Sequence, residues 1–495
     1  MTIHQPGARA LAARGAVLTL IAQVYRVTLS FVSSVFLARL LTPTDFGLVA
    51  MVSSIAAFGA VIQDLGLNQA LIQRERISAA QISALFWLSA GFSFVLALAF
   101  AAGAPLLAWF FGDSRLIALT IAFAFLFLFS GGQSQQLALL NRELRFKTLA
   151  GIDVVAATMS AVVGVALAWL TWSYWALFAA SLAYTLAGLV CVWIVCSFRP
   201  SRPSFEGDFK EIIRFGSGVS SFNIVNYFAR NADNLLIGRF YGSEQLGLYD
   251  RAYRLLLFPL QQIQFPLGRV MLPLLSRLQS DPKRYRKAYT ECITMLLAAT
   301  QPGLIFAIIF SEEVFLILFG ANWVPAASIF RWLGVAGLYH AMSSPTGWLF
   351  LSQGRSGDFF RLGLYNAVTI VGAFVAGLPW GPLGVAAAYA VSEYLLRVPV
   401  TFVLAGRRGP VTTRELRATA APHVVATLVA GLVLFALAQV IPPPGTLACL
   451  LLAVLSYGVY CLVLIIFPEK RRILIQTLAT LWSLSWLHRP VGTPN

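Results

Sequence analysis

Blocks of about 20 consecutive apolar residues recur along this chain. A helix of that length spans the hydrocarbon core of a bilayer, where only helices and closed barrels satisfy their backbone hydrogen bonds. Segment 117–129, IALTIAFAFLFLF, lacks the alternation of apolar and polar residues that a barrel strand requires. Only 11% of the 495 residues are charged, against about 25% in soluble domains. The sequence therefore predicts an all-α polytopic membrane protein.

Fourteen membrane spans are expected, and the basic residues orient them. One set of alternate loops and tails holds 26 Lys and Arg residues, and the opposite set holds 3. The positive-inside rule places the first set in the cytoplasm, so both termini are predicted to be cytoplasmic. The same rule accounts for the net charge of +16 without a nucleic-acid partner. The predicted spans are 16–38, 45–66, 80–104, 115–138, 150–171, 174–197, 214–238, 246–272, 289–310, 325–350, 361–380, 382–405, 420–441 and 446–467.

The sequence shows no motif for a metal, a nucleotide or a disulfide. The five cysteines and four histidines are dispersed, without a C-x-x-C pair. No G-x-x-x-x-G-K-[ST] motif for ATP is present. The longest predicted outer loop, 311–324, carries only Glu312 and Glu313 as acidic residues. We therefore expect a protein that is not an enzyme, with no catalytic residue, no metal and no cofactor.

Two segments 200 residues apart resemble each other. FLARLLTPTDFGL (36–48) aligns with LIGRFYGSEQLGL (236–248), and weaker similarities occur in the same order further along each half. The repeat predicts two six-helix lobes, an arrangement in which transporters bind substrate between the lobes near the membrane midplane. The expected domains are an N-terminal lobe (1–197), a cytoplasmic linker (198–213), a C-terminal lobe (214–405), a further helix pair (420–467) and a cytoplasmic tail (468–495).

The segment 226–254, NYFARNADNLLIGRFYGSEQLGLYDRAYR, concentrates charge inside an apolar region. A charge at the centre of a bilayer costs about 2.5–3.5 kcal/mol on insertion scales, so such residues usually face a polar cavity or a partner. Arginine in a wet cavity binds anions through charge-assisted hydrogen bonds. Alternatively, Arg230 with Asp233 and Asp250 with Arg254 neutralise each other on a helix face. The candidate substrate-binding residues are Arg26, Arg230, Asn231, Asp233, Asn234, Asp250, Arg251 and Arg254.

Other polar residues in the predicted spans have simpler interpretations. Glu393 and Arg397 are four residues apart, which favours a local ion pair on one helix over a substrate site. Asp153 is expected to cap the start of its helix or to lie at the interface. Arg331 and His340 are candidates for a cavity wall, although an isolated histidine is more often a packing residue.

Three motifs resemble the polysaccharide transporter family of the multidrug/oligosaccharidyl-lipid/polysaccharide exporter superfamily. They are LARLLTPTDFGLVAMV (37–52), QDLGLNQALIQR (63–74) and FARNADNLLIGRFYGSEQLGLYDRAYRLLLFPLQ (228–261). The resemblance implies a multi-pass flippase of the bacterial inner membrane that works by alternating access. It would move oligosaccharide repeat units on undecaprenyl pyrophosphate to the periplasmic leaflet, for exopolysaccharide, capsule or O-antigen (lipopolysaccharide) biosynthesis.

The expected partners follow from this resemblance. They are the lipid-linked oligosaccharide, membrane lipid, a coupling ion (proton or sodium) and the polysaccharide polymerase and export machinery, with no nucleic acid. A cation-coupled multidrug exporter of the same superfamily is the alternative function, although that class tends to have twelve spans and few cavity arginines. An integral-membrane polymerase or glycosyltransferase is a third alternative, and it would be expected to show a sizeable catalytic loop or a carboxylate-rich rim.

Overall fold

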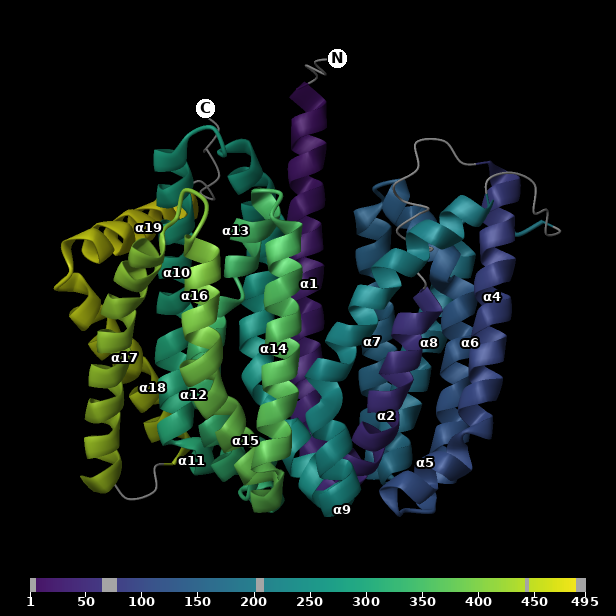
Figure 1. The fold of residues 1–495 in the computed structure, drawn as a ribbon. Coiled ribbons are helices and arrows are strands. Elements are labelled where there is room, and N and C mark those ends of the chain that lie inside the picture. Colours follow the sequence, from purple (N-terminus) through teal and green to yellow (C-terminus); the bar gives the residue numbers. More distant parts are fainter. Residues whose placement is uncertain (1–5, 65–77, 202–208, 441–444, 487–495) are drawn as a thin grey trace, which may run out of the picture. The chain divides into compact units, whose positions relative to one another are not determined.

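The computed structural model describes residues 6–64, 78–201, 209–440 and 445–486. The description includes their side chains, except those at 6–18, 20, 64, 209–226, 228–230, 477, 478 and 480–486. Every regular element in these ranges is a helix (Figure 1). The chain forms two compact units, Met1–Asp250 and Arg251–Asn495, and one long helix, α9, passes from the first unit to the second.

The first unit holds the elements up to the middle of α9. Ala176 of α8 is fully buried in a cluster with Leu37 and Leu41, so the end of α1 packs against α8. The element bounds are α1 (Pro6–Leu40), α2 (Pro43–Asp64), α4 (Ala79–Ala102), α5 (Ala104–Phe111), α6 (Arg115–Arg142), α7 (Phe146–Trp169), α8 (Tyr174–Val195) and α9 (Phe209–Arg277).

The second unit holds the rest of α9 and all later elements. These are α10 (Pro282–Ile309), α11 (Ser311–Phe319), η1 (Ala321–Trp323), α12 (Ala326–Ser343), α13 (Thr346–Ser352), α14 (Ser356–Gly377), η2 (Leu378–Trp380), α15 (Gly381–Ser392), the π-helical turn η3 (Glu393–Arg397), α16 (Val398–Gly406), α17 (Thr413–Val440), α18 (Thr446–Ile465) and α19 (Pro468–Trp486). The predicted lobes, 1–197 and 214–405, divide the chain elsewhere and stay a prediction.

Helices lie at the positions of the predicted spans, but the length and composition of the helices do not confirm the number of spans. Among the described residues, ten segments are long and apolar enough to cross a membrane. The predicted span 115–138 lies within α6, and 446–467 overlaps α18. Helices α9 and α12, which carry three predicted spans, are not among the ten. The total of fourteen spans therefore stays a prediction.

In both copies of the internal repeat, the helix is interrupted at the equivalent residue. In α9, Gly242 leaves helical geometry with φ 78° and ψ −176°, a conformation that glycine adopts readily. Its counterpart in the first copy is Thr42, which lies between α1 and α2. The backbone N–H of Thr42 donates to Asp45 Oδ2 (2.9 Å), and the N–H of Asp45 donates back to Thr42 Oγ1 (3.3 Å). One copy therefore begins its second helix with a reciprocal cap and the other with a glycine.

The two copies of the repeat touch each other through glycines. A Cβ atom on Gly47 of α2 would lie 1.6 Å from the backbone oxygen of Ser243, and one on Gly247 of α9 would lie 1.9 Å from that of Pro43. Pro43 and Ser243 are themselves 200 residues apart, so the contact is reciprocal under the offset of the repeat. The helices approach to a distance at which only glycine fits.

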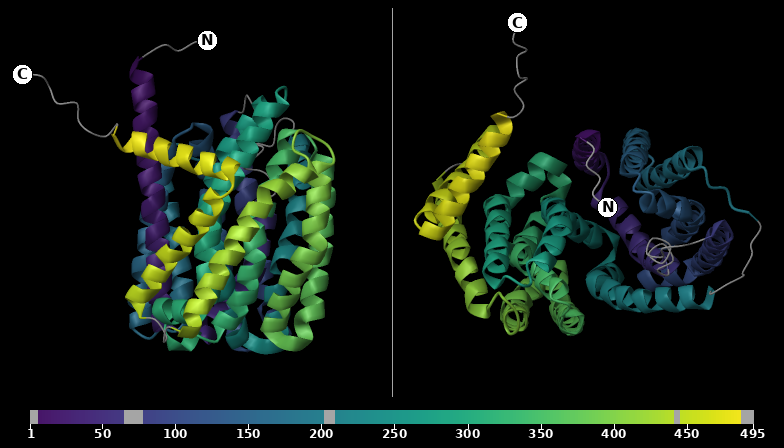
Figure 2. Two further views of the ribbon diagram at one scale, coloured as in Figure 1. Left: turned by 90° about the vertical axis from the view of Figure 1, so that its left-hand side faces the viewer. Right: turned by 90° about the horizontal axis from the view of Figure 1, so that it is seen from above.

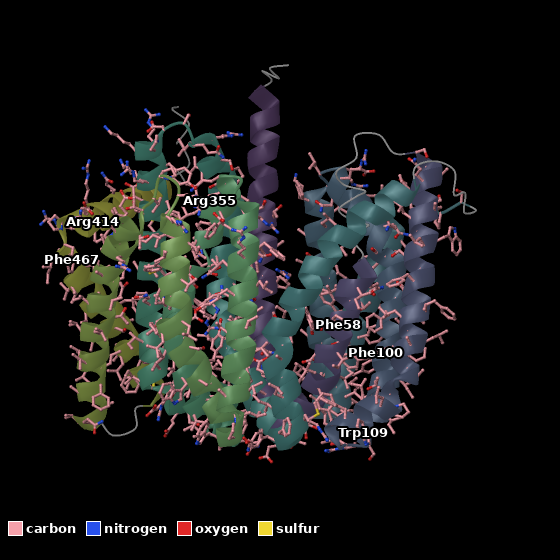
Figure 3. The ribbon with its side chains drawn as sticks, viewed as in Figure 1. Phe58, Phe100, Trp109, Arg355, Arg414 and Phe467 are labelled. Carbon is pink, nitrogen blue, oxygen red and sulfur yellow. The ribbon has the colours of Figure 1, made fainter. Side chains whose placement is uncertain are left out.

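Arg355, between α13 and α14, holds the end of α16 (Figure 3). Its guanidinium donates to the backbone oxygens of Leu404 (2.7 Å), Ala405 (3.2 Å) and Arg408, and it lies 3.1 Å from Asp358 Oδ2. The last carbonyls of a helix have no partner within the helix, and a cation there complements the helix dipole. The arginine therefore fastens the C-terminal end of α16 to the start of α14.

Replacing Arg355 with methionine is expected to lower the free energy of unfolding by about 2–4 kcal/mol, because several charge-assisted hydrogen bonds are lost together. The measurement is chemical or thermal unfolding of the purified protein in detergent. Arg361→Met is the matched control, since Arg361 is an exposed arginine on the neighbouring α14. Equal stability of the two variants would show that the contacts of Arg355 do not hold α16.

The last helix, α19, runs across the direction of α17 and α18 (Figures 1 and 2). Lys470 in its first turn is buried and donates to Thr294 Oγ1 of α10 (3.1 Å). Burial of the amine lowers the pKa of Lys470 below its usual range. This contact ties the start of α19 to the second unit.

Candidate functional site

The eight candidate residues lie on α1 and α9. Arg26 is on α1, and the other seven are on α9, where the unit boundary follows Asp250. Arg251 and Arg254 therefore belong to the second unit. The side chain of Arg230 is outside the described residues, so neither its predicted role nor its predicted pairing with Asp233 is tested.

Asp233 is held by neutral donors inside the first unit. Its side chain is buried; the Tyr249 hydroxyl donates to Oδ2 (3.0 Å), and the backbone N–H of Asn234 donates to Oδ1 (2.8 Å). Asn234 also donates from Nδ2 to Ser54 Oγ on α2 (3.3 Å), and Asn231 donates from Nδ2 to a backbone oxygen of its own helix. Two hydrogen bonds to a buried carboxylate stabilise it where water is excluded.

Replacing Tyr249 with phenylalanine is expected to cost about 1–2 kcal/mol of unfolding free energy, because the buried Asp233 carboxylate loses one of its donors. Thermal unfolding in detergent measures the loss. Tyr184→Phe is the control, because Tyr184 is 40% exposed on α8. If Tyr249→Phe is as stable as the control, the hydroxyl does not support Asp233.

Arg26 belongs to a polar group on α1, α7 and α8. Its Nη2 donates to Gln23 Oε1 (3.0 Å), and its charge acts on Asp153 of α7 and Tyr184 of α8. The expectation that Asp153 caps its helix is wrong, because α7 begins at Phe146 and Asp153 lies inside it. The structure thus places a carboxylate and a tyrosine within electrostatic reach of the candidate arginine on α1.

Of the three candidates nearest the unit boundary, two are buried and one is exposed. Arg251 is buried, with its guanidinium carbon 4.7 Å from the ring centroid of Phe319 and 5.4 Å from that of Trp323. Cation–π contacts of this kind stabilise a buried guanidinium. Asp250 is buried, whereas Arg254 is exposed. The substrate-binding roles of all three stay predictions.

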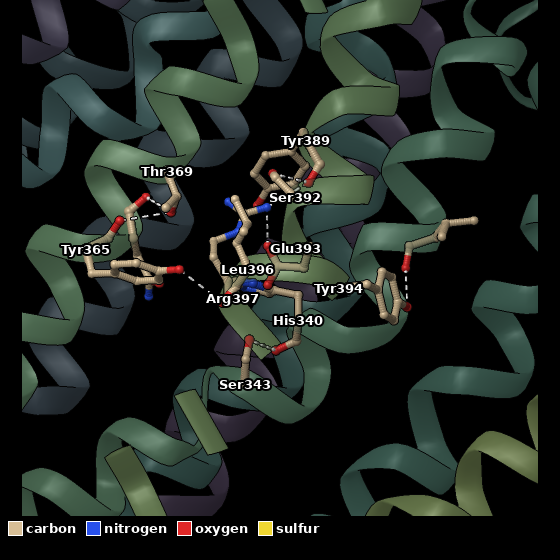
Figure 4. A network of polar contacts seen from close by, with 12 residues as sticks. His340, Ser343, Tyr365, Thr369, Tyr389, Ser392, Glu393, Tyr394, Leu396 and Arg397 are labelled. Atoms are coloured by element: carbon tan, nitrogen blue, oxygen red, sulfur yellow. Dashed lines mark hydrogen bonds and ion pairs between the residues drawn. The ribbon is translucent and has the colours of Figure 1, made fainter. Parts of the chain in front are cut away.

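The predicted ion pair between Glu393 and Arg397 is present. Glu393 Oε2 and Arg397 Nη2 are 2.5 Å apart, and both side chains are buried (Figure 4). The four-residue spacing was sufficient to predict the pair, but nothing in the sequence indicated the π-helical turn that contains it. Arg331, a candidate for a cavity wall, pairs with Glu312 at 2.8 Å in an exposed position, and its role in a cavity wall stays a prediction.

The described helices match solved membrane transporters. A lipid II flippase, MurJ, in an inward closed conformation aligns with 92% of this chain and 99% of its own at a TM-score of 0.73 and 13% identity. An inward-facing MATE-family multidrug resistance transporter of the MOP superfamily aligns with 82% of this chain and 99% of its own, at a TM-score of 0.61 and 15% identity. Identities this low show the fold alone. The protein is an all-α polytopic membrane protein with the fold of these transporters, as predicted.

The chain belongs to the family of polysaccharide biosynthesis proteins, whose sequence model matches residues 36–328. Teichuronic acid biosynthesis protein TuaB of Bacillus subtilis is 28% identical over 69% of this chain and 71% of its own. Lipopolysaccharide biosynthesis protein WzxC of Escherichia coli is 24% identical over 79% and 80%. Succinoglycan biosynthesis transport protein ExoT of Rhizobium meliloti is 27% identical over 72% of each chain. The family predicted from the sequence motifs is confirmed.

Proposed function

We propose that this protein is a flippase that moves undecaprenyl-pyrophosphate-linked oligosaccharide repeat units across the bacterial inner membrane. The observation that carries this proposal is the match of residues 36–328 to a polysaccharide biosynthesis family, in a chain with the fold of a lipid flippase. The matched range includes the charged segment 226–254. The product would feed exopolysaccharide, capsule or O-antigen biosynthesis, upstream of a polymerase and export machinery.

The proposed mechanism is alternating access between two lobes that arose by duplication. The equivalent breaks at Thr42 and Gly242 support a duplicated helix pair, and the proposed lobes are 1–197 and 214–405. Both termini would be cytoplasmic, as the basic loops predict. Helical bundles that repeat in this way typically move as rigid bodies around a central site.

The charged and the uncharged parts of the substrate would be bound by different candidate residues. Arg26, Arg230, Arg251 and Arg254 would bind the pyrophosphate through charge-assisted hydrogen bonds. Asn231, Asp233, Asn234 and Asp250 would accept or donate hydrogen bonds to sugar hydroxyls.

The test is transport of a lipid-linked oligosaccharide by the purified protein in vesicles, scored by access of an added glycosidase or lectin to the outer leaflet. We expect Arg254→Gln to reduce transport at least about tenfold if the arginine contributes one charged hydrogen bond to the transition between states. Arg361→Gln, an exposed control on α14, should transport at the wild-type rate. Export of cationic dyes without oligosaccharide transport would favour the multidrug exporter instead.

A further inference from the structure

Glu393 and Arg397 form a buried charge pair in the second unit (Figure 4). The ion pair spans 2.5 Å between Oε2 and Nη2, with the side chains 8% and 2% exposed respectively. Nη2 also donates to the backbone oxygen of Tyr389 (2.7 Å), and the guanidinium carbon lies 4.3 Å from the centroid of that ring. The pair is electrically neutral as a whole, and each charge depends on the other.

The pair occupies a single turn of π-helix. The N–H of Val398 donates to the carbonyl of Glu393, which is the i+5 to i pattern, and ordinary α-helix resumes on either side in α15 and α16. Tyr365 on α14 donates its hydroxyl to the carbonyl of Leu396 (3.2 Å), so the neighbouring helix also holds this turn. Single π-turns within α-helices are uncommon and occur frequently at functional sites.

The guanidinium of Arg397 uses only part of its hydrogen-bonding capacity. Among the described residues, its Nε and Nη1 atoms are buried without a hydrogen-bond partner. Buried donors in folded proteins are normally paired, so these two atoms are the unsatisfied part of the guanidinium in this state. The Glu393 carboxylate and the Tyr389 carbonyl are what keep the arginine in place.

We propose that Glu393 is the site at which a coupling proton binds and leaves during transport, and that Arg397 links this event to a rearrangement of the η3 turn. The inference rests on the proposed transport function and specifies its ion, which the sequence left open between a proton and sodium.

The chemistry of the pair favours a proton over a metal cation. Hard cations are bound by several oxygen ligands together. Here the carboxylate already has a guanidinium at 2.5 Å, and a metal ion at the same oxygens would be repelled by that charge. A proton needs one carboxylate oxygen, and Glu393 is the more exposed member of the pair.

Protonation changes the charge balance in a defined way. A hydronium ion gives its proton to the Glu393 carboxylate and leaves as water, so that Glu393 becomes a neutral carboxylic acid while Arg397 keeps its proton and its positive charge. A lone buried guanidinium is much less stable than a buried pair, so the arginine is driven toward water or other acceptors. Converting the π-turn to α-helix would rotate the following segment by about 100°, the angle of one residue. Such a rotation would carry Arg397 out of its present position.

Other titratable groups near the pair could contribute to a pH response, so their effects must be distinguished from that of Glu393. Tyrosine hydroxyls have an unperturbed pKa of about 10, well above the pH range of the experiment. Histidine is the side-chain type whose unperturbed pKa lies nearest neutrality, and His340 on α12 is half-buried. The titratable neighbours are His340 on α12, Tyr365 on α14, Tyr389 and Tyr394 on the α15–η3 segment (Figure 4), and Tyr339 on α12, which interacts electrostatically with both members of the pair.

The test is hydrogen exchange of residues 389–402 in the full-length protein, reconstituted without substrate in phosphatidylethanolamine and phosphatidylglycerol vesicles. The protection factor, corrected for the intrinsic exchange rate, should fall as the pH is lowered. Once Glu393 begins to take up its proton, the expected fall is about tenfold for each pH unit, which is the slope for one proton. It should be the same in sodium chloride and potassium chloride at one ionic strength. Protection that is independent of pH, or that responds to sodium at constant pH, would overturn the proposal.

Variants assign the effect to the carboxylate. Glu393→Gln should show low protection at every pH, because it mimics the protonated state. The double variant Glu393→Gln with Arg397→Gln leaves no lone charge and should also be insensitive to pH, which keeps the test decisive if the single variant does not fold. Glu312→Gln, in the exposed pair with Arg331, and His340→Asn should keep the wild-type profile. Loss of the pH response in His340→Asn would contradict the assignment to Glu393.

The exchange experiment is independent of oligosaccharide transport. A wild-type pH response in a protein that moves no lipid-linked oligosaccharide would refute the proposed function and leave the proton site standing. Transport that is unaffected by Glu393→Gln, together with a flat exchange profile, would refute the proton site and leave the flippase function standing.

Discussion

Replacing Gly247 with alanine is expected to reduce the yield of folded protein from membranes to a small fraction of the wild-type yield. The added Cβ would lie 1.9 Å from the backbone oxygen of Pro43, and a backbone atom cannot turn aside as a side chain can. Gly47→Ala should have the same effect, because its Cβ would lie 1.6 Å from the backbone oxygen of Ser243. Overpacking usually costs about 1–3 kcal/mol, and we expect more than about 3 kcal/mol where two helix backbones must separate.

Two glycines elsewhere in the first unit provide matched controls. Gly91 of α4 and Gly151 of α7 have no heavy atom within 4 Å of the position of an added Cβ. Alanine at either position should leave the yield unchanged or raise the stability by up to about 1 kcal/mol, because alanine favours helix more than glycine does. Both yield and thermal unfolding in detergent measure the effect. Wild-type stability of Gly47→Ala and Gly247→Ala would show that α2 and α9 are not in this close contact.

Removing one member of the Glu393–Arg397 pair should have the second large effect. Glu393→Gln leaves the buried guanidinium uncompensated, and we expect a loss of about 3–5 kcal/mol in unfolding free energy. The double variant Glu393→Gln with Arg397→Gln removes both charges together and should lose less than the single variant. Unfolding in detergent of the wild type, both single variants and the double variant forms a complete cycle that isolates the coupling between the two side chains.

The exposed pair between Arg331 and Glu312 is the control for this cycle. Its side chains are 46% and 58% exposed, although its 2.8 Å separation is similar to that of the buried pair. Exposed ion pairs contribute about 0–1 kcal/mol, so the same cycle there should give a coupling energy in that range. Equal coupling energies in the two cycles would mean that burial does not strengthen the dependence of Arg397 on Glu393.

The sequence predicted much of the fold because membranes constrain helices by length and composition. The apolar run at 117–129 could be recognised without any tertiary information, and it lies in α6. The local pair of Glu393 with Arg397 was also predictable, because helical geometry brings residues four apart together. The resemblance of three motifs to one family was sufficient to predict the membership that residues 36–328 now establish.

The contacts of the candidate site were less predictable, because they join residues far apart in the chain. The sequence offered Arg230 as the partner of Asp233, whereas the structure adds the hydroxyl of Tyr249, 16 residues further on. The rings that cover Arg251 come from α11 and η1, about 70 residues later. Spacing within one helix cannot reveal such contacts, since they depend on which helices become neighbours.

The charge-rich part of α9 and its counterpart around Thr42 show which features follow from the sequence and which follow from the tertiary structure. The sequence by itself predicted the membrane spans, the repeat of 36–48 at 236–248 and the concentration of charge in 226–254, because hydropathy and repeats are properties of the chain. Tertiary structure alone decided that Gly47 and Gly247 bring the two copies into backbone contact and that a π-turn holds Glu393 with Arg397. Both depend on separations of a few ångströms between atoms, which packing sets and composition does not encode.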